Sequence, residues 1–223
     1  MFIGHYAVAF AAKKAAPKTS LGTLFLGAQF IDLLWPLLML LGLEHASIDP
    51  GNTAVTPMDF YDYPISHSLL AVLIWSLLVG GAYVAVRRYR RGAWVLGVCV
   101  LSHWVLDFLT HRPDLPLGFG ESTRVGLGLW NSPVGTLVVE GGLFIAGVVL
   151  YLRTTRHRDR IGLYGFWALV LSLVAIHLGN MFGPPPPDTS FVAVAANASW
   201  LFVLWAYWVD KHRSSPTAGE TEG

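Results

Sequence analysis

Long apolar runs separated by short charged segments are the feature that most limits what this chain can fold into. Of its 223 residues, 54% are hydrophobic and only 13% are charged, whereas about one quarter of a typical soluble domain is charged. A run of about 20 apolar residues is long enough to cross a bilayer as a helix. Six runs have this length, at residues 21–43, 66–86, 92–110, 134–152, 162–182 and 190–209. We therefore predict an all-α fold, a polytopic transmembrane bundle of about six spans whose partner is the lipid bilayer.

The stretch before the first span, residues 2–12, is apolar but too short to cross. Lysines follow it rather than precede it, which is the reverse of a signal peptide. We expect a retained half-helix that is buried in the protein, because its backbone would otherwise leave polar groups unsatisfied in lipid. Such a helix carries His5 to the depth of Asp32 in the first span. The sequence therefore predicts that these two side chains lie side by side and share a ligand or a hydrogen bond.

The basic residues predict the orientation. With six spans, all four Lys and Arg clusters fall on one side of the membrane, at residues 13–18, 87–91, 153–160 and 211–213. That side is expected to be cytoplasmic, which places the chain in the inner membrane with a cytoplasmic C-terminus. We predict one integral-membrane domain, residues 1–213. The small polar residues 214–223 are expected to form a disordered cytoplasmic tail.

Two classes of function are disfavoured by composition. Cys99 is the only cysteine, which excludes an intrachain disulfide and a cysteine-based zinc site. The formal net charge is only +1, and no basic patch with interleaved aromatic residues indicates nucleic acid as a partner.

The segment 102–111 concentrates polar groups in an otherwise apolar span. His103, Asp107 and His111 follow one another at four-residue steps, which places them on one face of a helix. Asp32 and His103 fall near the middle of the membrane when residues are counted along each span, and His67 opens the second span. Because charged groups at membrane depth are costly, they indicate a functional site. His111 is either a third ligand of this face or a cap of the helix C-terminus.

These polar groups predict a metal site. A divalent cation would neutralise two of the carboxylates and order the histidines, and imidazole with carboxylate ligation fits zinc best, with manganese or iron as alternatives. The expected ligands are His5, Asp32, His67, His103 and Asp107.

Two further acids are candidates for the general base, Glu140 in the fourth span and Asp114 after the third. Neither has a spacing argument, and Glu140 is equally well explained as a protonated acid bonded between helices. For His177 a structural, hydrogen-bonded role is the favoured interpretation.

The same residues resemble a known family. An early His, an Asp in the first long span, a His-Ser pair opening the next span and a later His-x-x-x-Asp are similar to the YdjM-like predicted membrane-bound metal-dependent hydrolases. The His-x-x-x-Asp element is also similar to that of zinc-dependent phospholipase C. In this sequence the matching residues are His5, Asp32, His67-Ser68, His103 and Asp107, so the resemblance covers residues 1–114. It implies a membrane-embedded hydrolase that uses one or more divalent metals on a phosphoester or lipid.

The chain departs from that family at two places. It reads Gln29-Phe30-Ile31-Asp32 where the family has Pro-Asp-x-Asp, and Asp62-Tyr63 where the family has a His-Arg pair. It also carries segments of its own, His111-Arg112-Pro113-Asp114 and residues 125–131.

We interpret the chain as a hydrolase of an ester or phosphoester, acting at the outer face of the inner membrane. One alternative is a permease or ion carrier that uses the same polar cavity for transport. A second is a scaffold whose buried polar groups hold helices together.

Overall fold

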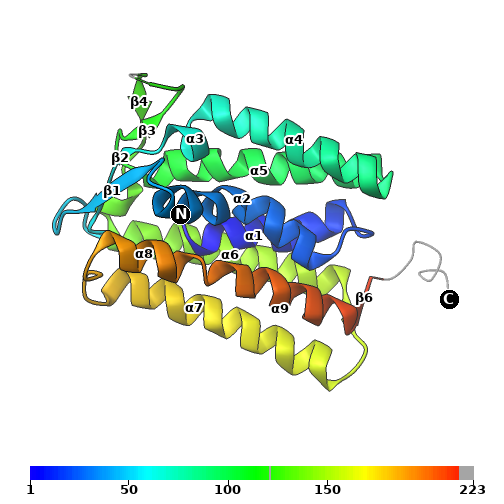
Figure 1. The fold of residues 1–223 in the computed structure, drawn as a ribbon. Helices are drawn as coiled ribbons and strands as arrows, with labels where there is room; N and C mark the ends of the chain where they lie inside the picture. The colour runs from blue at the N-terminus through cyan, green and yellow to red at the C-terminus, as the bar shows by residue number, and fades with distance from the viewer. Residues whose placement is uncertain (121, 216–223) are drawn as a thin grey trace.

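A computed structural model of the chain describes residues 1–120 and 122–215. In this part of the chain, six helices are long and apolar enough to cross a membrane, and the expected all-α bundle is confirmed (Figure 1). They are α2 (Leu21–Leu40), α4 (Leu69–Arg87), α5 (Arg90–Thr110), α6 (Pro133–Thr154), the π-helical turn Ile161–Gly165 continued by α7 (Phe166–Phe182), and α8 (Thr189–Ala196) continued by α9 (Ser199–Lys211).

The two ends of the bundle differ. At one end, which we call the hairpin end, short antiparallel pairs of strands connect the helices (Figure 1). The elements there are β1 (His45–Ile48) with β2 (Met58–Asp62), the single turn α3 (Pro64–His67), β3 (Leu115–Pro116) with β4 (Arg124–Val125), and the 3₁₀ turn Leu129–Asn131. The other end, which we call the basic end, carries the four Lys and Arg clusters of the sequence. There β5 (Arg156–His157) pairs with β6 (Arg213–Ser214).

The N-terminal half-helix is α1 (Ile3–Ala15), and its 13 residues are too few to cross a bilayer. It ends at the basic end with Lys13 and Lys14 in its last turn, where cations complement the helix dipole. α1 packs against α6, α2 and α5, and Figure 1 shows the N-terminus within the bundle. Tyr6, Ala9 and Phe10 are fully buried. Protein therefore surrounds this short helix, as the sequence predicts.

Aromatic side chains fill the half of the bundle nearer the basic end. The ring of Phe10 lies edge-on to Phe25 and Phe166, with ring centroids 5.1 and 5.8 Å apart. Phe144 and Tyr151 of α6 complete the group. Such pairs add stability beyond the apolar area that they bury. The core of this half is therefore apolar, and at the basic end itself the buried Lys13 pairs with Asp210.

Two predicted spans are interrupted. Ser68 has an extended backbone and separates α3 from α4: its hydroxyl accepts from the amide of Ala71 and donates to the carbonyl of Pro64. The second span therefore begins at Leu69 rather than at residue 66, because serine is a favoured N-cap. The last span bends after Ala196, where the Asn197 side chain donates to the carbonyl of Ala193 and competes with regular helical bonding.

The C-terminal segment is fixed at its start. Ser214 pairs with Arg156 across β5 and β6, so regular pairing reaches one position into the stretch expected to be a disordered tail. The rest of that prediction, residues 216–223, lies outside the described residues.

The packing of α1 against α6 predicts an unequal effect of two glycine substitutions. A Cβ on Gly147 would overlap the backbone of Ala7, whereas a Cβ on Gly142 meets nothing within 4 Å. We expect Gly147→Ala to lower the free energy of unfolding by about 1–3 kcal/mol through overpacking. Gly142→Ala on the same helix should be neutral or slightly stabilising. Thermal melts of the two variants in one detergent measure this, and equal melting temperatures would contradict the close approach of α1.

Candidate metal centre and its cavity

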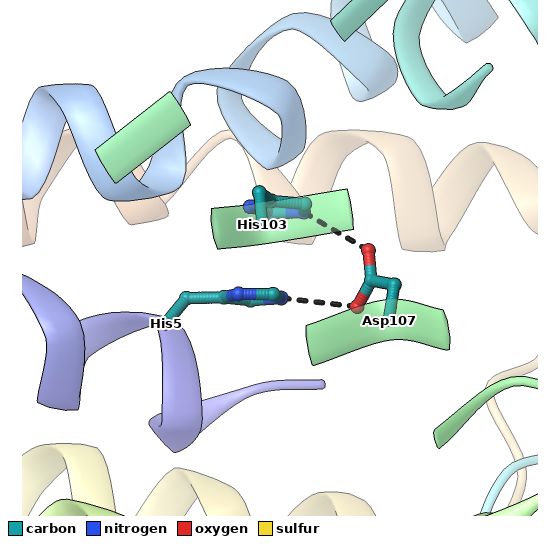
Figure 2. Close-up of side chains that lie close together, drawn as sticks. All are labelled: His5, His103 and Asp107. Carbon is teal, nitrogen blue, oxygen red and sulfur yellow. Dashed lines mark hydrogen bonds and ion pairs between the residues drawn. The ribbon is translucent and has the colours of Figure 1, made fainter. Parts of the chain in front are cut away.

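Asp107 of α5 connects two histidines (Figure 2). Its Oδ2 lies 3.2 Å from His103 Nε2, one turn earlier on α5, and its Oδ1 lies 3.1 Å from His5 Nε2 on α1. The amino group of Met1 lies 2.5 Å from the same Oδ1. The rings of His5 and His103 stack with their centroids 3.6 Å apart. All of these side chains are buried, so the carboxylate exchanges its hydration for protein donors.

The backbone fixes the tautomer of His103. Its Nδ1 lies 2.9 Å from the carbonyl oxygen of Ala28 in α2, and a carbonyl can only accept, so Nδ1 carries a proton. In the neutral form of the ring, the lone pair is then on Nε2. This nitrogen is buried, and among the described residues it has no partner with hydrogen-bond geometry, although carboxylate oxygens of Asp107 and Asp32 lie within 3.4 Å.

A chain of hydrogen bonds sets the tautomer of His67 in the same way. Ser66 donates its hydroxyl to Glu44 Oε2 at 2.6 Å and its amide to Oε1 at 2.8 Å. Because that hydroxyl proton is used, the oxygen accepts from His67 Nδ1, 2.7 Å away. His67 Nε2 therefore also presents a lone pair to the site. Burial raises the pKa of Glu44, and the hydrogen bonds from Ser66 oppose that rise.

Four donor atoms from three elements, α2, α3 and α5, lie close together. His67 Nε2 lies 3.6 Å from Asp32 Oδ1 and 3.9 Å from Asp107 Oδ2, and His103 Nε2 lies 3.4 and 3.2 Å from the same two oxygens. Ligands at 2.0–2.2 Å from a tetrahedral metal are about 3.3–3.6 Å apart. The four nitrogen–oxygen distances range from 3.2 to 3.9 Å, on either side of that spacing, and Asp32, His67 and His103 form one compact group of possible ligands. Asp32 is the exposed member of the four, with 32% of its side chain accessible against 6% or less for the other three.

His5 lies in the cluster but not beside Asp32 as expected. Its hydrogen bond goes to Asp107, and no ion pair with Asp32 within 4 Å exists in the described residues. The reason is the stacked ring of His103, which contacts both His5 and Asp32. The half-helix does reach the depth of the site, but it meets α5 there rather than the acid of α2. The expected His5–Asp32 hydrogen bond is thus wrong in partner, and a ligand shared by the two stays a prediction.

A cavity of about 580 Å³ adjoins the donors. Asp32, His67 and Asp107 line one part of it, and Ile176 of α7, Val192 of α8 and Phe202 of α9 line an apolar part. Loop residues of the hairpin end such as Val55 and Pro184 also border it. The cavity therefore joins a polar, anionic end to an apolar wall.

Glu140 and His177 also line this cavity. Glu140 Oε2 accepts from the amides of Phe2 and Gly4, at 2.9 and 3.4 Å. These are free N–H groups at the start of α1, where Phe2 supplies no side-chain cap. Glu140 thus anchors α1 as a distant N-cap. The Nε2 of His177 is buried without a hydrogen-bond partner in the described part of the chain.

Asp114 holds His111 at the edge of the cavity. Its Oδ1 accepts from His111 Nδ1 at 2.9 Å and from the Tyr63 hydroxyl at 3.3 Å, and its Oδ2 accepts from Arg112 at 3.2 Å. Burial raises the pKa of the Tyr63 phenol well above its usual range, and the Asp114 carboxylate adds to that rise, so Tyr63 remains a donor. Both oxygens of Asp114 are thus engaged. Asp114 thus orients His111, and its expected role as general base stays a prediction.

Comparison with protein-family models, with curated proteins and with solved structures gave no match. The site is therefore interpreted from its own geometry.

Sequence reasoning missed the groups outside the spans that support the site. Ser66 precedes His67 directly, so its position beside a candidate ligand was a usable signal. Glu44 had no such signal, because only the turn after α2 and the β1–β2 hairpin bring it to Ser66. The sequence marks Tyr63 only as a departure from the family pattern, yet its ring contacts the rings of both His67 and His111.

The role of Glu140 as an anchor predicts a loss of stability in a variant that keeps its size. Glu140→Met would leave the buried amides of Phe2 and Gly4 without an acceptor, which costs about 1–3 kcal/mol for each unsatisfied group. We expect faster hydrogen exchange across the first turn of α1 and a lower melting temperature. Val138→Met, at an exposed position of the same helix, is the control and should change neither. Unchanged exchange in Glu140→Met would leave the anchor without support.

Proposed function

We propose that this chain is a membrane-embedded, metal-dependent hydrolase of an ester or phosphoester, as its resemblance to the YdjM-like family implies. One observation carries the proposal: the Nε2 atoms of His67 and His103 each lie 3.2–3.9 Å from a carboxylate oxygen of both Asp32 and Asp107. The tautomers that Ala28 and Ser66 impose on the imidazoles are those of metal ligands.

The charge of the donors favours a divalent cation. Asp32 and Asp107 contribute two negative charges, and the amino group of Met1 offsets part of that charge at Asp107. An uncompensated carboxylate costs about 2.5–3.5 kcal/mol at membrane depth. Zinc suits this mixed nitrogen and oxygen set, with manganese or iron as alternatives. When bound, such a cation supplies a nucleophilic water near neutral pH and polarises the bond to be cleaved. Within the cluster His5 serves Asp107 as a hydrogen-bond donor, and the accessible side of Asp32 leaves room for a substrate.

The shape of the cavity favours an amphiphilic substrate. The reacting group would lie at the polar end beside Asp32, and an apolar portion would lie along Ile176, Val192 and Phe202. A lipid ester or phosphoester has this division. The basic clusters lie at the opposite end of the bundle, which by the positive-inside rule is cytoplasmic. The site would then face the outer side of the inner membrane, with the C-terminus inside.

A carrier would need a polar path through the other half of the bundle. The aromatic group around Phe10 occupies the core of that half, and a second cavity at the basic end shares no lining residue with the cavity beside the donors. This supports a hydrolase rather than a permease or ion carrier.

Metal content tests the ligand set. Purified protein should retain near-stoichiometric zinc, manganese or iron, and chelation should abolish its hydrolysis of p-nitrophenyl esters or p-nitrophenyl phosphodiesters. His103→Ala and Asp107→Ala should each release the metal, because each removes one of four donors. His157→Ala, at an exposed position in β5, should retain it. Absence of metal in the native protein, or full retention in both site variants, would overturn the proposal.

The hydrogen-bond chain through Ser66 predicts a weaker but measurable effect. Ser66→Ala removes the acceptor of the His67 Nδ1 proton and leaves Glu44 with one donor fewer. Loss of such an outer partner typically lowers metal affinity by about 10–100-fold. Competition with a chelator of known affinity measures this. Ser102→Ala, whose hydroxyl bonds only to its own helix at the Cys99 carbonyl, should keep native affinity. Equal affinities in the two variants would count against His67 as a ligand.

A further inference from the structure

The end of α5 brings a third histidine to the proposed metal cavity. His111 follows Asp107 by one helical turn, and its amide donates to the Asp107 carbonyl at 2.8 Å. Its ring is only 3% exposed and lies among aromatic rings, with its centroid 4.4 Å from Trp130 and 5.1 Å from Phe60. It lines the same cavity as Asp32 and His67.

The ring of His111 is held in one orientation. Nδ1 bonds to Asp114, and Asp114 is in turn fixed by Tyr63 and Arg112. Arg112 also pairs with Asp59 of β2, which ties the arrangement to the first hairpin. Because Nδ1 is occupied, Nε2 is the ring nitrogen left to act in the cavity. No hydrogen bond to Nε2 exists among the described residues.

A histidine whose Nδ1 faces a buried carboxylate is suited to carry a proton on Nε2. The carboxylate fixes the orientation of the ring and the tautomer. Among the other candidates, Glu140 accepts from the start of α1, and both oxygens of Asp114 hold other groups. His177 also lines the cavity, but in the described part of the chain no carboxylate is hydrogen-bonded to its Nε2. His111 is therefore the group best placed to exchange protons with a bound molecule.

We propose that His111 donates a proton to the leaving oxygen of the substrate, so that the natural substrate is an ester or phosphoester of an aliphatic alcohol. This inference rests on the proposed hydrolase function. An alkoxide is about as basic as hydroxide, whose conjugate acid has a pKa of about 15.7, and it leaves readily only when protonated. A nitrophenolate is a weak base and leaves without that help.

The reaction balances without any further reagent. Water adds its oxygen to the acyl carbon or the phosphorus, and the bond from that atom to the alcohol oxygen breaks. The electron pair of the broken bond stays on the alcohol oxygen, which takes the proton from His111 Nε2. The proton that the attacking water releases restores the imidazolium. The products are one acid and one alcohol, and the protein returns to its starting state.

Matched substrates that differ only in the leaving group test the inference. Tributyrin and p-nitrophenyl butyrate share an acyl group, and phosphatidylcholine and p-nitrophenyl phosphorylcholine share a phosphoryl group. For the pair that the native protein hydrolyses, we expect His111→Asn to slow release of the aliphatic alcohol by about 10²–10⁴-fold, the usual contribution of general acid catalysis. Release of nitrophenol should change by less than about tenfold. Asp114→Asn should show the same selectivity with a smaller loss.

A second pair of residues provides the matched control. His45 Nδ1 lies 2.8 Å from Asp62 Oδ2, but this pair is exposed and does not line the cavity. His45→Asn should leave both rates unchanged. Metal content should stay native in all three variants, which separates loss of proton transfer from loss of the metal.

The outcomes distinguish this inference from the proposed function. If the native protein hydrolyses neither nitrophenyl probe, the hydrolase proposal fails and this inference fails with it. If the native protein hydrolyses a nitrophenyl probe but His111→Asn slows both leaving groups equally, the hydrolase stands and the role of His111 is wrong. A native protein that cleaves only the nitrophenyl member of each pair would likewise exclude an aliphatic alcohol ester as substrate.

Discussion

The carboxylate of Asp107 is the interaction on which the arrangement of this bundle depends. One oxygen binds the first turn of α1 through His5, and the other faces His103 and the histidine of α3. A buried carboxylate at membrane depth is unstable without such partners. The partners come from parts of the chain that are far apart in sequence. Asp107 therefore links the insertion of the half-helix to the assembly of the donor set.

The half-helix α1 depends on neighbouring helices for its burial and for its hydrogen bonds. A helix as short as α1 cannot cross a bilayer, so its first N–H groups lie in the apolar interior and need acceptors there. Glu140 accepts two of them, and α6 approaches closely where Gly147 faces the backbone of Ala7. The same helix then fills the basic half of the bundle with Phe10. The short helix α1 thus fills the core of one half of the bundle and carries His5 into the other half.

Rigid support of the donors comes from outside the long helices. The single turn α3 carries His67, and Ser66 and Glu44 fix the ring from the hairpin end. Asp114 fixes His111 in a comparable way. In both cases a carboxylate on a connecting segment leaves Nε2 as the free ring nitrogen. Ligand binding and proton transfer both need this orientation, because either function fails if the ring turns over.

The sequence by itself determined the class of fold and the membership of the cluster. Spans follow from the length of apolar runs, and half a helix follows from a run that is too short, because burial of backbone in lipid allows few alternatives. The four-residue step from His103 to Asp107 placed them on one face because residues four apart are neighbours on a helix.

Only the tertiary structure decided the partners. It paired His5 with Asp107 instead of Asp32, because the ring of His103 stands between them. It also split the second span at Ser68, where capping and continued helix differ little in local energy. The contact between Glu44 and Ser66, and the cavity face of His111, depend on how loops fold over the hairpin end. No periodic pattern encodes that folding, since it is set by the packing of segments distant in sequence.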